Sequence, residues 1–257
     1  MIILISPAKT QDYTPLQSKV EVTQAEQQNK ISQLVAILKQ YTPKELEKTL
    51  GVSKTLATLN HQRYQAFNTK HYTLENAKPA LFAYQGDVYR YLQAEQLSKS
   101  AIKFLQQHLL ILSGLYGYLK PLDLIQPYRL EMQAPLTIKG VKSLHDFWKE
   151  SITTAINTAL AKQKNKTIIN LASQEYFKAV DLSRLTAPVI TIHFKEVRQG
   201  KLRTIALNAK RARGMMVRFI ADNKLDQPQQ LQQFQEGNYK YNSALSNTHD
   251  WVFCREG

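Results

Sequence analysis

Short apolar runs alternate irregularly with longer amphipathic segments along this chain, and that alternation limits the folds it can adopt. Residues 1–5, 109–112 and 167–171 are apolar runs with the length of buried strands. Residues 23–40 and 143–162 instead repeat apolar side chains at helical spacing. The order follows neither a strict strand–helix–strand alternation nor a helical bundle. We therefore expect an α+β fold, or an irregular α/β fold, built on one mixed β-sheet with surrounding helices.

The size of the chain suits one large core. It has 257 residues, 43% of them hydrophobic, which is enough to bury a substantial core without disulfides or metal. No linker or internal repeat divides it, so we expect a single compact domain over residues 1–257. Residues 79–84 and 202–207 predict two further strands, and residues 239–241 and 251–253 predict a final hairpin.

Capping residues predict where several helices begin. Thr42 followed by Pro43 combines a cap with a proline at the first helical position, and this helix is expected to end near Gly51. Ser53 caps the next helix. A Gln-rich helix is expected to start near Pro228.

The excess of positive charge points to an anionic partner. Lys and Arg number 34 against 20 Asp and Glu, a formal net charge of +14. Such a chain attracts polyanions, and nucleic acid is the leading interpretation. An anionic membrane surface, a phosphorylated small substrate and simple solubility are the alternatives.

The cysteine content and the N-terminus indicate a reducing compartment. Cys254 is the single cysteine, which excludes an intrachain disulfide framework. Residues 1–5 lack the basic segment of a signal peptide, and the apolar runs are too short to span a bilayer. We expect a cytoplasmic protein that does not enter the membrane.

A basic helix over residues 208–223 gives the clearest physical signal. On a helical wheel one side carries Lys210, Arg211, Arg213 and Arg218, and the opposite side is apolar. Arginine offers a planar fork that fits phosphate oxygens, although a solvated helix face is the plainer explanation. Gly214 in mid-helix suggests close approach by another backbone or a ligand. The preceding strands add further basic residues, Lys195, Arg198, Lys201 and Arg203.

A segment rich in Gly and Tyr, residues 113–119, is a candidate phosphate loop. Gly114 and Gly117 lie three apart, which allows backbone N–H groups to turn toward a phosphate. A tight turn alone explains these glycines equally well.

Polar residues also follow several predicted strands, where functional loops often lie. Asp87 and Glu175 each stand between a strand and a helix. Asp123, Arg129 and Glu131 stand in otherwise apolar surroundings, and an ion pair is the structural explanation for Arg129 and Glu131. We predict that Asp87, Arg129 and Glu175 meet in one pocket, because strand ends of one sheet converge. The His residues are scattered and show no metal-ligand spacing.

Six sequence blocks together resemble one family. They stand in the order seen in the YaaA peroxide-stress proteins: residues 5–10, 86–89, 113–117, 127–132, 170–176 and 210–214. Gln133 stands where the family is expected to have glycine, and Gln174 where an acidic residue is usual.

The resemblance implies a bacterial cytoplasmic protein that helps cells survive hydrogen peroxide by keeping free intracellular iron low. It further implies a basic cleft, a helix-hairpin-helix-like element and DNA binding, with residues 114–117 as the local candidate for that hairpin. It implies no established reaction and no cofactor. The candidate anion-binding residues are then Lys9, Gly114, Gly117, Arg129, Lys210, Arg211, Arg213 and Arg218.

Three functions compete at this point. The first is a DNA-binding stress protein without catalysis, whose contacts are mostly to phosphates and independent of sequence. The second is an enzyme acting on a nucleobase or nucleotide, since residues 113–128 also resemble a motif of deazapurine-handling proteins. Its candidate acid–base groups are Asp87, Asp123, Glu131 and Glu175. The third is direct iron sequestration, which needs clustered carboxylates or His that the sequence does not show.

Overall fold

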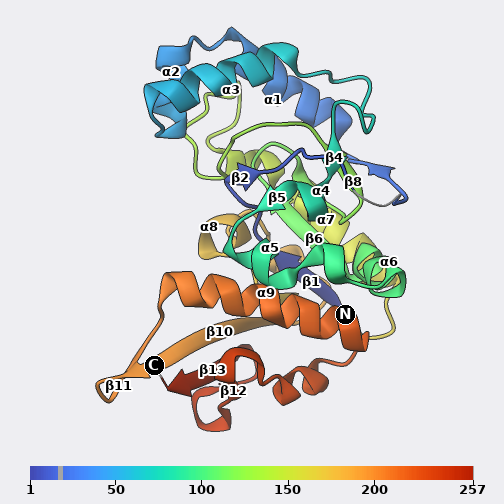
Figure 1. The fold of residues 1–257 in the computed structure, drawn as a ribbon, viewed down its shortest axis with the longest axis vertical. Helices are drawn as coiled ribbons and strands as arrows, with labels where there is room; N and C mark the ends of the chain where they lie inside the picture. The colour runs from blue at the N-terminus through green and yellow to red at the C-terminus, as the bar shows by residue number, and fades with distance from the viewer. Residues whose placement is uncertain (17–19, 257) are drawn as a thin grey trace.

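An eight-stranded mixed sheet forms the centre of the computed structural model, which describes residues 1–16 and 20–256 (Figure 1). Five strands in the middle are parallel, in the spatial order β6 (Leu109–Ser113), β1 (Ile2–Ile5), β9 (Ile168–Asn170), β10 (Val189–Arg198) and β13 (Asp250–Glu256). Antiparallel strands complete the sheet: β7 (Gly117–Leu119) beside β6, β12 (Lys240–Tyr241) beside β13, and β11 (Lys201–Arg203) in a hairpin with β10. The predicted α+β class with one mixed sheet is confirmed.

The connections reverse direction at β1. From β1 the chain reaches β6 on one side, and it later returns to β9 on the other side. All four residues of β1 are buried, so this strand is the middle of the core. In open sheets of this kind, ligands bind outside the carboxyl ends of the strands where the order reverses. The topology therefore predicts a ligand site among the residues that follow β1 and β9.

Helices cover the sheet, and a group of three helices lies beyond one end of it. The chain has α1 (Gln28–Gln40), α2 (Pro43–Leu50), α3 (Lys54–Ala66), α4 (Ala80–Ala83), α5 (Asp87–Leu92), α6 (Lys99–His108), α7 (Leu144–Ala161), α8 (Gln174–Phe177) and α9 (Ala206–Asn223). In Figure 1, α1–α3 lie together at the top, and α9 lies with β10–β13 at the bottom. None of the helices in the described residues combines the length and the apolar character needed to cross a membrane.

Short elements join these layers. Two small sheets pair β2 (Thr10–Gln11) with β5 (Tyr84–Gln85), and β8 (Asp123–Ile125) with β3 (Thr23–Gln24) and β4 (Lys78–Pro79). Short 3₁₀ helices cover Ala94–Gln96, Leu182–Arg184, Pro228–Gln233, Glu236–Asn238 and Ser243–Leu245.

The predicted starts of α2 and α3 are confirmed. The Thr42 hydroxyl accepts from the Glu45 N–H while the Glu45 carboxylate accepts from the Thr42 N–H, and Pro43 is the first helical residue. Gly51 ends α2 in the left-handed region at φ 59°. Ser53 caps α3, as predicted.

Three sequence predictions are wrong in detail. Residues 79–84 are not one strand: α4 occupies most of the segment, and because its four residues are all buried, their pattern could not distinguish helix from strand. Residues 202–207 are divided between β11 and the start of α9, since the pairing with β10 covers only three residues. The Gln-rich segment from Pro228 is a 3₁₀ helix.

Helix α9 packs directly on the backbone of α5. A Cβ at Gly214 would lie 2.0 Å from the Val88 carbonyl oxygen, so only glycine permits this approach. The close approach predicted at Gly214 is confirmed, and the neighbour is a backbone. The contact fixes the first half of α9 beside the loop that precedes α5.

Candidate active site at the carboxyl edge of the sheet

A cavity of about 410 Å³ lies where the chain leaves β1 and β9, and we call it the carboxyl-edge cavity. Five segments contribute its lining: residues 6–11, 85–89, 128–131 and 171–176, with Lys210 and Arg213 from α9. Asp87, Arg129 and Glu175 all line it, so the prediction that these three residues meet is confirmed. Lys9 and Glu131 line it as well.

Hydrogen bonds between the two strand ends form the base of this cavity. The Ser173 N–H donates to the Ser6 hydroxyl at 2.8 Å, and that hydroxyl donates to the Ser173 hydroxyl at 3.2 Å. The Tyr89 hydroxyl donates to the Ser6 carbonyl at 3.0 Å, which ties α5 to the same point. Ser6 and Tyr89 were not proposed as site residues, although Ser6 directly follows a buried strand.

Two arginines give the cavity its electrostatic character. The Arg129 guanidinium donates to Glu131 at 3.2 Å, and Lys9 binds the other Glu131 oxygen at 2.9 Å. The Nε atoms of Arg129 and Arg213 are buried and have no hydrogen-bond partner in the described residues. Arg213 forms no ion pair within residues 1–16 and 20–256, and burial lowers the pKa of its guanidinium. Because a buried cation is normally paired, this arrangement favours an anionic ligand.

Glu175 is the carboxylate best suited to proton transfer. Burial raises the pKa of its carboxyl, and the neighbouring Glu131 carboxylate raises it further, while an N–H bond from Gln133 at 3.4 Å partly offsets the shift. Asp87 instead pairs with Arg211 at 3.5 Å at the start of α5. The two carboxylates therefore have different environments within one cavity.

Comparison with known proteins identifies the family. The family model described as "Peroxide stress protein YaaA" matches residues 1–245. The chain belongs to the YaaA family. A UPF0246 protein of Rickettsia bellii is 47% identical over 255 residues, covering 99% of this chain and 100% of the relative. UPF0246 proteins of Caulobacter vibrioides and Francisella tularensis are 44% and 42% identical over 255 residues, each covering 99% of this chain and 99% and 100% of the relatives.

The YaaA assignment confirms the resemblance seen in the sequence blocks and places the chain among peroxide stress proteins. The two departures from the family pattern, Gln133 and Gln174, are both at exposed positions. Their side chains are therefore accommodated without changing the buried part of the cavity.

The basic residues of α9 do not form one solvent-exposed face, contrary to the wheel analysis. Arg213 lines the cavity, and Arg211 pairs with Asp87 and lies 5.4 Å from the Tyr91 ring. Arg218 donates to the carbonyls of Leu92 and Gln93 at the end of α5 and pairs with Asp222 at 3.2 Å. The reason is the contact at Gly214, which brings α5 against this side of α9.

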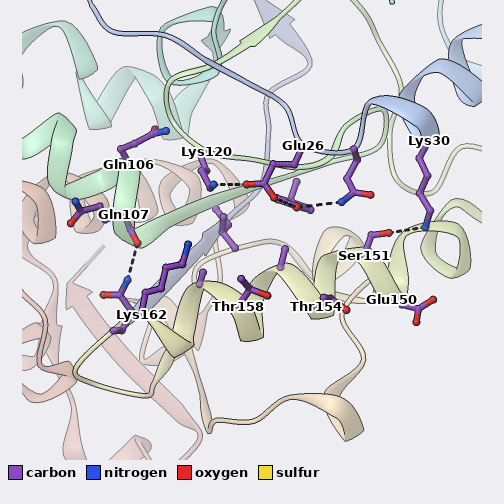
Figure 2. A pocket seen from close by; sticks show the side chains of 16 residues that line it. Glu26, Lys30, Gln106, Gln107, Lys120, Glu150, Ser151, Thr154, Thr158 and Lys162 are labelled. Carbon is purple, nitrogen blue, oxygen red and sulfur yellow. Dashed lines mark hydrogen bonds and ion pairs between the residues drawn. The ribbon is translucent and has the colours of Figure 1, made fainter.

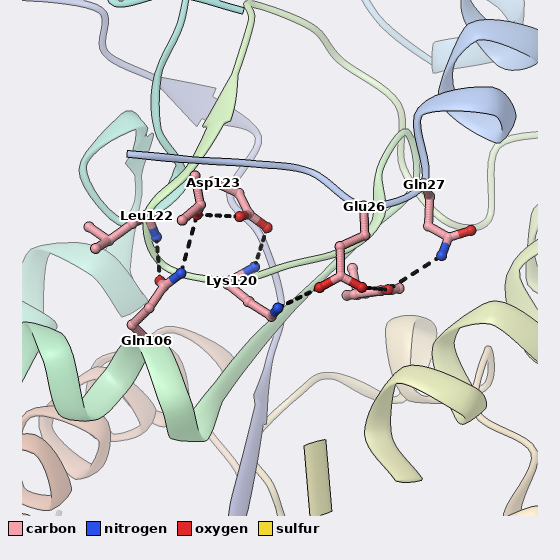
Figure 3. Close-up of polar contacts among 8 residues, drawn as sticks. Glu26, Gln27, Gln106, Lys120, Leu122 and Asp123 are labelled. Atoms are coloured by element: carbon pink, nitrogen blue, oxygen red, sulfur yellow. Dashed lines mark hydrogen bonds and ion pairs between the residues drawn. The ribbon is translucent and has the colours of Figure 1, made fainter. Parts of the chain in front are cut away.

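Asp123 does not line the carboxyl-edge cavity with the other candidate acid–base groups. Figure 3 shows its polar contacts with Lys120 and neighbouring groups. It is buried in β8, where it accepts from the Thr23 hydroxyl at 2.6 Å and from the Lys120 N–H at 2.7 Å. Burial raises its pKa to about 6. Its contacts join β8 to β3, and it does not line the cavity that holds the other three candidates, Asp87, Glu131 and Glu175.

Gly114 and Gly117 are buried in the turn between β6 and β7. A Cβ at Gly114 would lie 2.3 Å from the Leu130 carbonyl oxygen, and one at Gly117 would lie 2.5 Å from the Trp148 ring. Gly117 also has φ 71°, which favours glycine. The tight-turn explanation therefore holds over the phosphate loop. Since the turn joins two strands, the expected helix-hairpin-helix-like element does not lie here.

A second and larger cavity, about 960 Å³, lies along α7, and we call it the α7 groove (Figure 2). Three of its five charged residues, Glu26, Lys30 and Lys120, have partners at the groove, whereas Glu150 pairs with Arg184 at 3.7 Å and Lys162 forms no ion pair in the described residues. Lys120 pairs with Glu26, whose other oxygen accepts from the Tyr118 hydroxyl at 2.8 Å. Lys30 donates to the Phe147 carbonyl at 2.9 Å and to the Ser151 hydroxyl at 2.7 Å. No lining side chain in the described part of the groove has a buried polar atom without a partner.

Within residues 1–16 and 20–256, no group of three or more His, Cys, Asp or Glu side chains is arranged to hold a metal ion. The carboxyl-edge cavity thus combines cations for an anion with one carboxyl suited to proton transfer.

Proposed function

We propose that this YaaA-family protein acts in peroxide stress by binding DNA, and that the carboxyl-edge cavity holds one nucleotide of the bound strand. The observation that supports this most directly is that Arg129 and Arg213, whose buried Nε atoms have no partner in the described residues, both line one cavity. Guanidinium groups are well matched to phosphate oxygens. The cavity volume of about 410 Å³ is in the range typical of small-molecule sites.

The net charge of +14 supports a polyanion rather than a free metabolite as the physiological partner. Contacts to phosphates give affinity that is largely independent of base sequence. In this proposal the protein protects DNA during peroxide stress in the cytoplasm. Limitation of free intracellular iron is the second part of the proposed role, and it comes from the family resemblance.

Competition between a mononucleotide and a DNA strand tests the proposal. A deoxynucleoside 5′-monophosphate should displace a labelled single strand from the protein, as measured by fluorescence anisotropy. Log affinity for duplex DNA should also fall with log salt by about 0.9 for each neutralised phosphate. Absence of DNA binding at low salt, or binding that no mononucleotide reduces, would contradict it.

A second candidate function, an enzyme acting on a nucleobase or nucleotide, is favoured by Glu175. Its raised pKa and its position in the same cavity as Glu131 and Asp87 suit a general acid–base group. Incubation with nucleotides followed by mass spectrometry tests this function. Product that forms with the wild type and is lost in Glu175→Gln supports catalysis, and unchanged nucleotides in both contradict it.

A further inference from the structure

The hairpin formed by β10 and β11 is seen in Figure 1 at the carboxyl end of β10. Because β10 runs parallel to β9, this end lies at the edge of the sheet where the residues after β9 line the cavity. Thr191 of β10 pairs with Asn170, the last residue of β9. The seven residues from Ile192 to Arg198 therefore continue past the end of β9. At about 3.3 Å per residue, they carry the hairpin roughly 20 Å beyond it.

The hairpin has a defined turn. Gln199 and Gly200 connect the two strands with φ 52° and 69°, and Arg198 pairs with Lys201 across them. Two successive left-handed residues form the type of turn that matches the twist of paired strands. The basic residues around this turn therefore have a fixed relative arrangement.

One face of the hairpin is basic. Residues paired across strands project from the same face. The pairs Arg198 with Lys201 and Glu196 with Arg203 therefore share a face, and we call Arg198, Lys201 and Arg203 the basic ribbon. Lys201 and Arg203 are exposed, whereas Glu196 is only 1% exposed. The accessible part of this face is thus positive.

Glu196 positions the ribbon relative to the cavity. Its carboxylate accepts from Arg198 at 3.0 Å, from Arg255 at 3.0 Å and from the Asn208 amide at 2.7 Å. Half of the Arg198 side chain remains exposed (50%). Asn208 belongs to α9 and precedes the cavity residue Lys210 by two positions. The first turns of α9 therefore join the ribbon to the rim of the cavity.

We infer that the basic ribbon binds the sugar–phosphate backbone of the same nucleic acid strand whose nucleotide occupies the carboxyl-edge cavity. This inference rests on the proposed function and adds the path of the strand: from Arg213 in the cavity, past Lys210, to Lys201 and Arg203. A mononucleotide reaches only the cavity, whereas a longer strand reaches the ribbon as well.

Strand length is the variable that tests this path. Single strands of increasing length are titrated against the wild type and Lys201→Ala/Arg203→Ala. The matched control is Lys44→Ala/Lys48→Ala, which removes the same charge from exposed positions on α2, at the opposite end of the molecule in Figure 1. Binding of a deoxynucleoside 5′-monophosphate by all three proteins verifies that the cavity is intact.

In the wild type and the control, affinity should rise with strand length until the strand reaches the ribbon. In the ribbon variant that rise should be lost, and the salt slope for long strands should shrink by about 1.4, at about 0.7 per phosphate contact. Equal length dependence in the ribbon variant and the control would overturn the inference while leaving cavity binding in place. A ribbon variant that loses binding to anionic vesicles but keeps wild-type binding to nucleic acid strands would also overturn it. A wild type that binds neither mononucleotide nor strand would overturn the proposed function itself.

Discussion

The carboxyl-edge cavity and the α7 groove are both polar, but they differ in how their charges are satisfied. In the α7 groove, Lys120 pairs with Glu26, and Lys30 binds a carbonyl and a hydroxyl of its own chain. In the carboxyl-edge cavity, Arg213 and Arg129 keep buried Nε atoms that nothing in the described chain binds. The groove has more than twice the volume, about 960 against 410 Å³, yet the smaller cavity has the stronger need for a ligand.

The difference shows that volume alone is a poor guide to a binding site. A polar surface whose groups bind one another gains little from a ligand, because the ligand must replace bonds that already exist. A buried cation without an ion pair, such as Arg213, has no such bond to replace when an anion binds. The carboxyl-edge cavity also lies at the carboxyl end of the central strands, which is the general position of ligand sites in such sheets.

The largest expected effect removes both unpartnered donors. Arg129→Gln/Arg213→Gln should weaken binding of a deoxynucleoside 5′-monophosphate by at least roughly 100-fold, since each charge-assisted hydrogen bond contributes about 1.5–3 kcal/mol. Calorimetric titration measures the affinity. The groove variant Lys120→Gln/Lys162→Gln removes the same charge and should bind as the wild type does. Equal losses in both variants would erase the distinction between the two regions.

The pH dependence of stability tests the structural role of Asp123, which lies outside the carboxyl-edge cavity. The pKa of Asp123 is raised from 3.8 to about 6, so the folded state holds this proton more tightly than the unfolded state. Asp123 should therefore lower the free energy of unfolding as pH rises from about 4 to 6, by up to about 3 kcal/mol. Chemical denaturation across this pH range should show this decrease in the free energy of unfolding for the wild type and not for Asp123→Asn. The same pH slope in both proteins would mean that another group titrates.

A smaller effect is expected from Glu175 on binding. Because its pKa is raised, acidification protonates it early and makes the cavity more positive. The affinity for a dinucleoside phosphate, whose phosphodiester stays charged, should increase as pH falls through that raised pKa, by roughly tenfold or less. Glu175→Gln should bind with little pH dependence. A wild-type affinity that weakens on acidification would contradict this electrostatic account.

Much of this site could be predicted from the sequence, since three of its residues follow local rules. Asp87, Arg129 and Glu175 each follow a strand in the chain, where functional loops often lie. The expected reason for their meeting is wrong, because β5, β8 and β9 belong to three different sheets, so the meeting depends on how these sheets pack. The mixed sheet and the helix starts at Thr42 and Ser53 also follow from local patterns. These features depend on neighbours in the chain.

The errors concern residues whose roles depend on distant contacts. The wheel places Arg218 on an outward face, but the approach of α5 at Gly214 covers that side. At Gly117 the sequence left a tight turn and a phosphate loop open, and the Trp148 ring, from a remote part of the chain, leaves no space for a side chain. Asp123 was a candidate acid–base group, but it accepts from Thr23, which lies 100 positions earlier in the chain. The sequence likewise does not show that Arg213 lacks an ion pair, because this depends on which acidic side chains the fold brings near it.

The arginine Nε–H resonances in nitrogen–proton NMR spectra test the central claim most directly. During titration with a deoxynucleoside 5′-monophosphate, the Nε–H signals of Arg129 and Arg213 should shift together and saturate. Backbone signals of Ser151 and Thr154 in the α7 groove should stay in place under the same conditions. Shifts confined to the groove, with both arginine signals unmoved, would contradict the assignment of the carboxyl-edge cavity as the ligand site.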